Sequence, residues 1–166
     1  MLYVVTALKP EAQAFVDKYR LPKTKQNTQI AVIISGVGTE NMFNTTKDIV
    51  KKMQENDIII NVGICGANNK FKIGELLEVY IPSLNVGTRG SLTCVDAEIS
   101  TRDDYELVDM ESEGFLEATK KIKNRYIFKV VSDHFEPHKV TKEGTKSLIF
   151  NVIDDINEII FNKAKH

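Results

Sequence analysis

Two stretches of this chain carry acidic residues whose types suit the chemistry of a glycosidic bond. Asp109-Met110-Glu111 is an acidic start of a predicted helix, and Ser132-Asp133 follows the apolar run Val130-Val131 at the end of a predicted strand. A carboxylate just after an apolar strand lies where an open α/β sheet binds ligands, at the carboxyl ends of its strands. One such acid can hold a sugar hydroxyl while the other protonates a leaving group, which together break a glycosidic bond.

The elements that must position these acids alternate along the chain. The apolar spacing predicts strands at residues 2–8, 29–35, 74–81, 91–95 and 126–131, and a further buried strand that starts at 58–60 and runs into the glycine-rich segment 61–67. It also predicts a loop at 97–105, and helices that open at Pro10 and span 41–54, 109–121 and 146–161. This alternation predicts a three-layer α/β/α sandwich around a central mixed, largely parallel sheet. A chain of 166 residues suits one core, so we expect residues 1–166 to form a single domain.

Composition excludes several classes of function. Lys and Arg (22) and Asp and Glu (23) give a formal net charge of -1, and no long basic run occurs, so we expect no nucleic-acid partner. The apolar stretch at 1–8 lacks a basic leader and meets Lys9-Pro10 too soon for a signal peptide or a membrane span. We therefore expect no membrane association.

The cysteines and histidines do not form a metal-binding pattern. Cys65 and Cys94 lack CxxC spacing and indicate reduced thiols in a cytoplasmic protein. The three histidines make no ligand array with them, so we expect no metal. Cys65 has no partner base in the sequence, which disfavours a role as a nucleophile.

Collinear motifs resemble the purine nucleoside phosphorylase superfamily, and within it the 5′-methylthioadenosine/S-adenosylhomocysteine nucleosidases. The resemblance runs from end to end of the chain. It is carried by Thr6-Ala7-Leu8-Lys9-Pro10-Glu11, Ser35-Gly36-Val37-Gly38, Asn61-Val62-Gly63-Ile64-Cys65-Gly66-Ala67 with Lys72-Ile73-Gly74-Glu75, Asp109-Met110-Glu111, and Ser132-Asp133.

The resemblance implies a role for each acid. Asp133, oriented by Ser132, would protonate N7 of a purine, although a helix cap is its structural alternative. Glu111 would hold the ribose hydroxyls and stabilise an oxocarbenium-like sugar, with Met110 packed against that sugar. Glu11 would activate the attacking water, although a first-turn acid also interacts favourably with a helix dipole.

The resemblance also implies contacts to the substrate from the glycine-rich segment, at Gly63 and Ile64. The aromatic residue that stacks on the base in this family is absent after the strand ending near Val95. Phe135 is a candidate replacement, and a position in the core is the alternative for it.

Hydrolysis is favoured over phosphorolysis by two positions. Phosphorylases of this superfamily carry an Arg and a Ser where this chain has Asn61 and Ile64, and neither of these can neutralise a phosphate dianion. The chain is thus predicted to be a cofactor-independent purine nucleosidase acting on a nucleoside such as 5′-methylthioadenosine or S-adenosylhomocysteine. A phosphorylase of the same fold and a trimmed, non-catalytic nucleoside-binding relative remain the alternatives.

The connection at residues 82–90 is shorter than the segment that helps to close the pocket and build the dimer in the nucleosidases. A shortened pocket wall can be completed by a second subunit, so we expect a homodimer.

Overall fold

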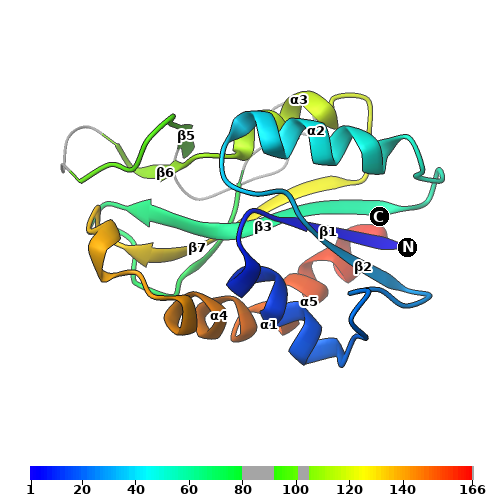
Figure 1. Ribbon diagram of the computed structural model, residues 1–166, viewed down its shortest axis with the longest axis horizontal. Coiled ribbons are helices and arrows are strands. Elements are labelled where there is room, and N and C mark those ends of the chain that lie inside the picture. The colour runs from blue at the N-terminus through cyan, green and yellow to red at the C-terminus, as the bar shows by residue number, and fades with distance from the viewer. Residues whose placement is uncertain (80–91, 101–104, 166) are drawn as a thin grey trace.

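The computed structural model describes residues 1–79, 92–100 and 105–165 of the chain. The described residues form one mixed sheet flanked by helices (Figure 1). Its seven strands are β1 (Leu2–Thr6), β2 (Ile30–Ile34), β3 (Ile58–Ala67), β4 (Leu76–Glu78), β5 (Leu92–Cys94), β6 (Leu107–Asp109) and β7 (Arg125–Asp133).

Strand β3 organises the sheet. Its first half pairs in parallel with β1, which in turn pairs with β2, and its other edge pairs in parallel with β7 along nearly its whole length. The last two residues of β3 pair antiparallel with β6, β5 runs parallel to β6, and β4 is antiparallel to β7. The sheet is therefore mixed and largely parallel, as predicted.

The site forms at one edge of β3, between the residues that pair with β1 and those that pair with β6. Strand β1 covers Ile58–Asn61, and β6 begins to pair only at Gly66, so neither strand pairs with the backbone between them. Backbone N–H groups there need another partner, because an unpaired buried donor costs about as much as a lost hydrogen bond.

Helices cover both faces of the sheet, which confirms the three-layer prediction (Figure 1). The helices α2 (Thr39–Val50) and α3 (Ser112–Ala118) lie on one face, and α1 (Lys9–Tyr19), α4 (Lys142–Phe150) and α5 (Ile153–Ala164) lie on the other. A short 3₁₀ turn, η2 (Pro137–Lys139), follows β7.

Alternating strand residues supply apolar cores on both faces of the sheet. On the α1, α4 and α5 face, Val4, Ile60 and Phe128 pack with Phe15 and Ile153. The neighbouring strand positions point the opposite way because side chains in a strand alternate between faces. There, the second core consists of buried Val5, Met42, Ile49, Ile59, Val79, Phe115 and Ile127.

Three helix predictions require correction. The single terminal helix predicted at 146–161 is two helices, because the chain turns at Val152, whose ψ is -1° and whose N–H bonds to Ile149 three residues back. The helix predicted at 41–54 spans Thr39–Val50. The helix predicted to begin at Asp109 starts at Ser112, because Asp109 is the last residue of β6 and precedes the helix as its hydrogen-bond acceptor.

Other boundaries differ by a few residues. The strand predicted at 126–131 runs from Arg125 to Asp133, so Ser132 and Asp133 belong to it. Parts of the strands predicted at 74–81 and 91–95, part of the loop predicted at 97–105 and the whole 82–90 connection lie outside the described residues.

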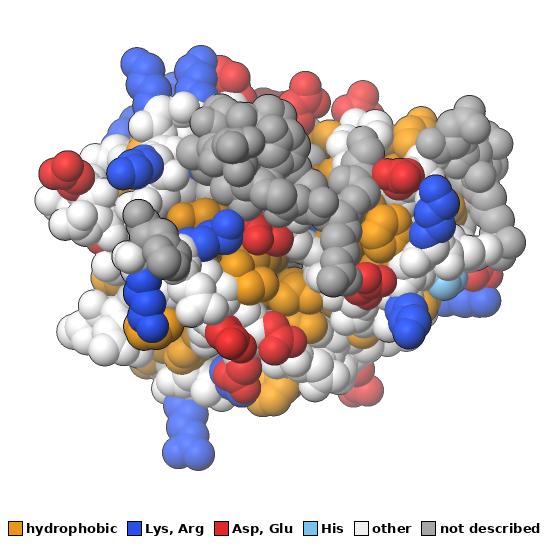
Figure 2. Space-filling model, turned by 180° about the vertical axis from the view of Figure 1, so that it is seen from behind, with side chains coloured by type: hydrophobic (Ala, Val, Ile, Leu, Met, Phe, Trp, Pro, Cys, Tyr) orange, Lys and Arg blue, Asp and Glu red, His pale blue; other side chains and the backbone are white. Residues whose placement is uncertain are grey.

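Two surface properties bear on the sequence predictions. Within the described ranges, no helix is long and apolar enough to cross a bilayer. On the face in Figure 2, the Lys and Arg side chains are dispersed among acidic and uncharged ones.

Candidate active site

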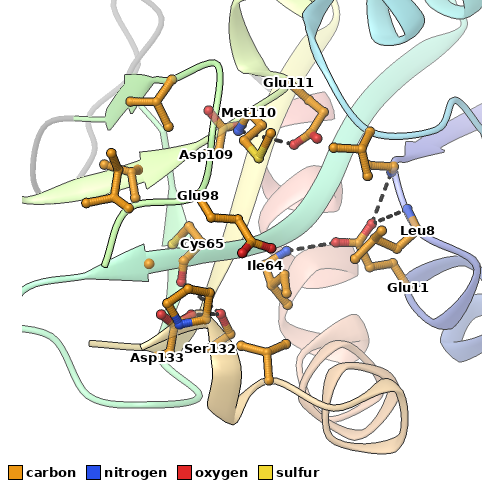
Figure 3. Close-up of a pocket in the computed structure, with 18 residues that line it drawn as sticks. Leu8, Glu11, Ile64, Cys65, Glu98, Asp109, Met110, Glu111, Ser132 and Asp133 are labelled. Carbon is orange, nitrogen blue, oxygen red and sulfur yellow. Dashed lines mark hydrogen bonds between the residues drawn. The ribbon is translucent and has the colours of Figure 1, made fainter. Parts of the chain in front are cut away.

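A cavity of about 210 Å³ lies where β1, β3 and β7 end and the chain passes from β6 to α3. Figure 3 shows the labelled acids of this site arranged around a common space. The lining residues are Ala7, Leu8, Glu11, Val37, Ile64, Cys65, Gly66, Val95, Glu98, Ile99, Val108, Asp109, Met110, Glu111, Ser132, Asp133, Pro137 and Val140. The cavity thus brings together all the acids that the sequence analysis selected.

Glu11 is held at the start of α1 by three backbone donors. Its Oε2 accepts hydrogen bonds from the N–H groups of Ala7 (3.0 Å) and Leu8 (2.9 Å). Its Oε1 accepts one from Ile64 (3.0 Å), on the part of β3 that neither β1 nor β6 pairs with (Figure 3). Glu11 therefore lies in the first turn of α1 and lines the cavity at the same time.

The surroundings of Glu11 suit a group that exchanges a proton near neutral pH. Its side chain is almost completely buried, and burial raises the pKa of Glu11 to about 7. The amides of Leu8 and Ile64 and the charge of Lys129 act in the opposite direction and lower it, but burial is the largest effect. A carboxylate with a pKa near 7 can act as a general base at neutral pH.

Lys129 is a functional candidate that the sequence analysis did not select. It lies in the middle of β7 with only 1% of its surface exposed, and its Nζ is 2.8 Å from Asp109 Oδ2. Burial alone would lower the pKa of Lys129, but the carboxylates of Asp109, Glu111 and Glu11 outweigh burial, so the pKa is raised. Lys129 therefore remains a cation beneath the acids of the site.

Gly63 allows Lys129 and Glu11 to approach each other. A Cβ added to Gly63 would lie 3.2 Å from Glu11 Oε1 and 3.3 Å from Lys129 Nζ. A side chain at this position would therefore compete with both charged groups for space. Gly63 itself is not among the residues that line the cavity, so the structure places it behind the site.

Glu111 connects the β6–α3 junction to the glycine turn before α2. Its Oε1 accepts a hydrogen bond from Gly38 N (3.0 Å), and its Oε2 accepts one from Met110 N (3.3 Å). Gly36 and Gly38 have φ values of 86° and 99°, a left-handed backbone that favours glycine, as the sequence predicted for this turn. Met110 and Glu111 both line the cavity.

Asp109 has a structural role beside them. Its carboxylate accepts hydrogen bonds from the backbone N–H and the hydroxyl of Ser112, at 2.9 and 2.6 Å, and forms the ion pair with Lys129. It therefore fixes the start of α3, and with it the position of Glu111.

Asp133 is oriented by two donors at the end of β7. Ser132 donates its hydroxyl proton to Asp133 Oδ1 (2.5 Å), and Glu136 N donates to Oδ2 (2.8 Å). The Glu136 contact closes the turn after β7 and does not cap a helix, because the 3₁₀ turn η2 has Glu136 at its N-cap and no side-chain cap hydrogen bond. The structure thus contains the Ser132 contact to Asp133, and not the helix cap considered as the alternative. Both Ser132 and Asp133 line the cavity.

Two other predicted positions behave differently. Ile64 lines the cavity and contributes its backbone N–H to Glu11. Phe135 lies outside this cavity: it is buried, has φ of 58°, and packs over Gly66, where an added Cβ would be 3.3 Å from its ring. The structure thus gives Phe135 the core position that was the alternative to a wall of the pocket.

Cys65 lines the cavity as a neutral thiol. Burial raises the pKa of Cys65 to about 12, so the thiolate that a nucleophile requires is not formed near neutral pH.

The charge of the cavity lining has one sign. Five carboxylates line it, from Glu11, Glu98, Asp109, Glu111 and Asp133, and none of the described lining residues is Lys, Arg or His. Within residues 1–79, 92–100 and 105–165, no cluster of three or more His, Cys, Asp or Glu side chains has a geometry that could hold a metal ion.

Comparison with known proteins gives results only at the level of structure. No protein-family model matches this chain, and no curated protein sequence does.

Solved structures match over nearly the whole chain. The 5′-methylthioadenosine/S-adenosyl homocysteine nucleosidase of Campylobacter jejuni superposes with a TM-score of 0.72 at 13% identity, covering 99% of each chain. The chain has the fold of these nucleosidases. The Arabidopsis thaliana 5′-methylthioadenosine nucleosidase gives 0.66 at 18% identity, with 98% of this chain and 95% of that chain covered.

The nucleosidase fold is shared with a further hydrolase. The futalosine hydrolase of Helicobacter pylori gives a TM-score of 0.68 at 14% identity, covering 93% of this chain and 97% of that chain. The resemblance drawn from the motifs is thus confirmed for the fold. Because one fold can carry many activities, the chemistry depends on the residues of the site.

Proposed function

We propose that this protein is a nucleosidase that hydrolyses the N-glycosidic bond of a purine nucleoside such as 5′-methylthioadenosine or S-adenosylhomocysteine. The observation that carries the proposal is a cavity lined by five carboxylates and, among its described lining residues, by no cation. Negative charge around the sugar stabilises the positive charge that develops on the sugar as the bond to the base lengthens.

Glu11 is the proposed general base. A carboxylate offers about four lone-pair directions, and the amides of Ala7, Leu8 and Ile64 occupy three of them. The remaining direction can accept a hydrogen bond from water. Glu11 takes a proton from this water as the water oxygen bonds to the anomeric carbon.

Lys129 is the proposed electrostatic partner of Glu11. Its charge lowers the pKa of Glu11 and so maintains an ionised fraction of a carboxylate that burial would otherwise protonate more completely. Since Asp109 Oδ2 is only 2.8 Å away, Lys129 is held in place by an ion pair beneath the cavity.

Glu111 and Asp133 complete the reaction. Glu111 accepts hydrogen bonds from the ribose hydroxyls, with Met110 beside the sugar, and Asp133 donates a proton to the base as the bond from the base to the anomeric carbon breaks. The products are the free base and the free sugar. The proton on Glu11 returns to Asp133 through solvent, which restores both groups.

The same cavity disfavours phosphorolysis. A phosphate dianion is bound by Arg forks, lysines or clustered amide donors. Here the Ile64 N–H is occupied by Glu11, and Lys129 is paired with Asp109. Phosphate would have to enter a space surrounded by carboxylates.

The test is a panel of purine nucleosides incubated with the protein in buffer free of phosphate, with the released base measured by chromatography. We expect adenine from methylthioadenosine, and release of adenine slowed by about 10²- to 10⁴-fold with the Asp133→Asn variant. Strict dependence on added phosphate would identify a phosphorylase instead, and tight binding without release of base would identify a nucleoside-binding protein.

We propose in addition that the protein is a cytoplasmic homodimer. Both cysteines are free thiols in the structure, which suits a reducing compartment. The dimer proposal rests on the short 82–90 connection in the sequence. Sedimentation at micromolar concentration tests it, with a species of twice the 18.7 kDa chain mass expected and a monomer contradicting it.

A further inference from the structure

We propose that Glu98 is a specificity-determining residue that selects a base carrying an N–H donor on the edge facing it. This inference rests on the proposed function, because it says which bases of a nucleoside substrate the site accepts. Glu98 lies four residues beyond β5 and lines the same cavity as Glu11, Glu111 and Asp133. Neither the motifs nor the reaction steps above use it.

The backbone holds this segment against the site. Cys94 pairs with Asp109 in the β5–β6 ladder, and Val95 N donates to Asp109 O (2.8 Å) as the chain leaves β5. Three residues later, the Glu98 side chain points toward the centre of the labelled pocket residues (Figure 3). The segment is thus fixed to the residue that precedes Met110 and Glu111.

The wall around Glu98 suits a flat base. Val95, Ile99 and Val108 line the cavity beside it, and Pro137 and Val140 line it from the segment after β7. An aromatic ring packs well against such apolar side chains, but they cannot distinguish one heterocycle from another. A carboxylate among them can, because it accepts hydrogen bonds only.

The charge of Glu98 sets the requirement. Its side chain is exposed in the structure, and no hydrogen bond or ion pair joins it to any other described residue. A nucleoside that fills the cavity covers this carboxylate and removes its water. Burying a charge without a partner is costly, and the other carboxylates of the lining cannot compensate, so the ligand itself must supply the donor.

A base with an exocyclic amino group meets this requirement, and a base with only ring acceptors on that edge does not. A site built around a buried polar group rejects analogues that leave this group unpaired. Adenine and unsubstituted purine differ by one amino group, which makes them a matched pair of probes.

The experiment compares kcat/KM for adenosine and purine riboside in the wild type, Glu98→Ala, Glu98→Gln and Asp96→Ala. Asp96 is the control because it is an acid on the same segment but does not line this cavity. Glu98→Ala is expected to lower the adenosine to purine riboside ratio by about tenfold to a hundredfold, the range for a lost charge-assisted hydrogen bond. Glu98→Gln keeps one acceptor and is expected to lose less, and Asp96→Ala is expected to keep the wild-type ratio.

A Glu98→Ala ratio equal to that of the wild type overturns the inference and leaves the nucleosidase proposal standing. Calorimetric binding of free adenine and free purine separates the two proposals. One outcome is that the wild type turns over neither nucleoside but binds free adenine more tightly than free purine, and that Glu98→Ala removes this difference in affinity. In that case the nucleosidase proposal fails and the Glu98 inference holds. Binding of neither base together with no turnover overturns both.

Discussion

Replacing Glu11 with glutamine should make the free energy of unfolding of this protein measurably less dependent on pH. The folded protein holds Glu11 with a pKa of about 7, against 4.5 for the unperturbed group, and burial is the main cause. In the folded state Glu11 therefore retains its proton over a pH range in which the unfolded chain has already released it. The contribution of Glu11 to the free energy of unfolding is therefore fully present below pH 4.5 and is lost as the pH rises through about 7.

The size of the effect follows from these two values. One pKa unit corresponds to about 1.4 kcal/mol, and between pH 5 and pH 8 the linkage removes about 2.5 kcal/mol from the free energy of unfolding. For a chain of 166 residues this corresponds to a fall of about 5–10 °C in Tm. The Glu11→Gln variant has no such proton to lose, so this component should disappear.

Glutamine also carries a cost that does not depend on pH. The carboxylate accepts N–H donors on both oxygens, whereas the amide of glutamine has an oxygen on one side only. At least one backbone N–H is then left without an acceptor, at about 1–3 kcal/mol. The diagnostic quantity is therefore the difference in Tm between pH 5 and pH 8, not Tm at a single pH.

The assay is thermal unfolding followed by circular dichroism at several pH values, for the wild type, Glu11→Gln and Glu143→Gln. Glu143 is the matched control because it also lies in the first turn of a helix, α4, but is exposed. The control should follow the wild type. Equal loss of Tm in Glu11→Gln and the wild type between pH 5 and pH 8 would refute a buried Glu11 with a raised pKa.

Three further substitutions test other parts of the site. Lys129→Met leaves Asp109 buried without its partner and should lower the free energy of unfolding by about 3–5 kcal/mol in urea titrations; a loss below about 1 kcal/mol would contradict the buried pair. Asp133→Asn should lower kcat by about 10²- to 10⁴-fold for purine nucleosides but little for p-nitrophenyl riboside, whose leaving group needs no proton, and an equal loss on both substrates would argue against base protonation. Gly114→Ala places a Cβ 2.2 Å from Thr39 O, so α3 must move from α2 at a cost of about 1–3 kcal/mol; an unchanged Tm would show that this contact relaxes freely.

Local patterns predicted most of the fold. Apolar runs such as Ile58-Ile59-Ile60 identify central strands because a strand buried on both faces is apolar at every position. The three-residue strand β6 was missed because its pairing with the end of β3 is a long-range contact that so short a run does not reveal. The break at Val152 was missed because the apolar spacing continues across it.

The site was predicted unevenly for a similar reason. The motifs drew attention to Glu11, Glu111 and Asp133, and the structure brings these three to one cavity. Lys129 carried a signal that was not used: a single lysine within the apolar run Tyr126-Ile127-Phe128-Lys129-Val130-Val131 must find a buried anion or leave the core. Glu98 carried none, since its entry into the cavity depends on the path of the chain after β5.

The identity of the sugar product tests most directly whether water, and not phosphate, attacks the sugar in this site. Methylthioadenosine is incubated with the wild-type protein in excess phosphate, and the products are separated by liquid chromatography with mass spectrometry. Free methylthioribose, formed in step with adenine and at a rate unaffected by phosphate, is the expected result. Methylthioribose 1-phosphate as the sugar product would contradict the proposed hydrolysis.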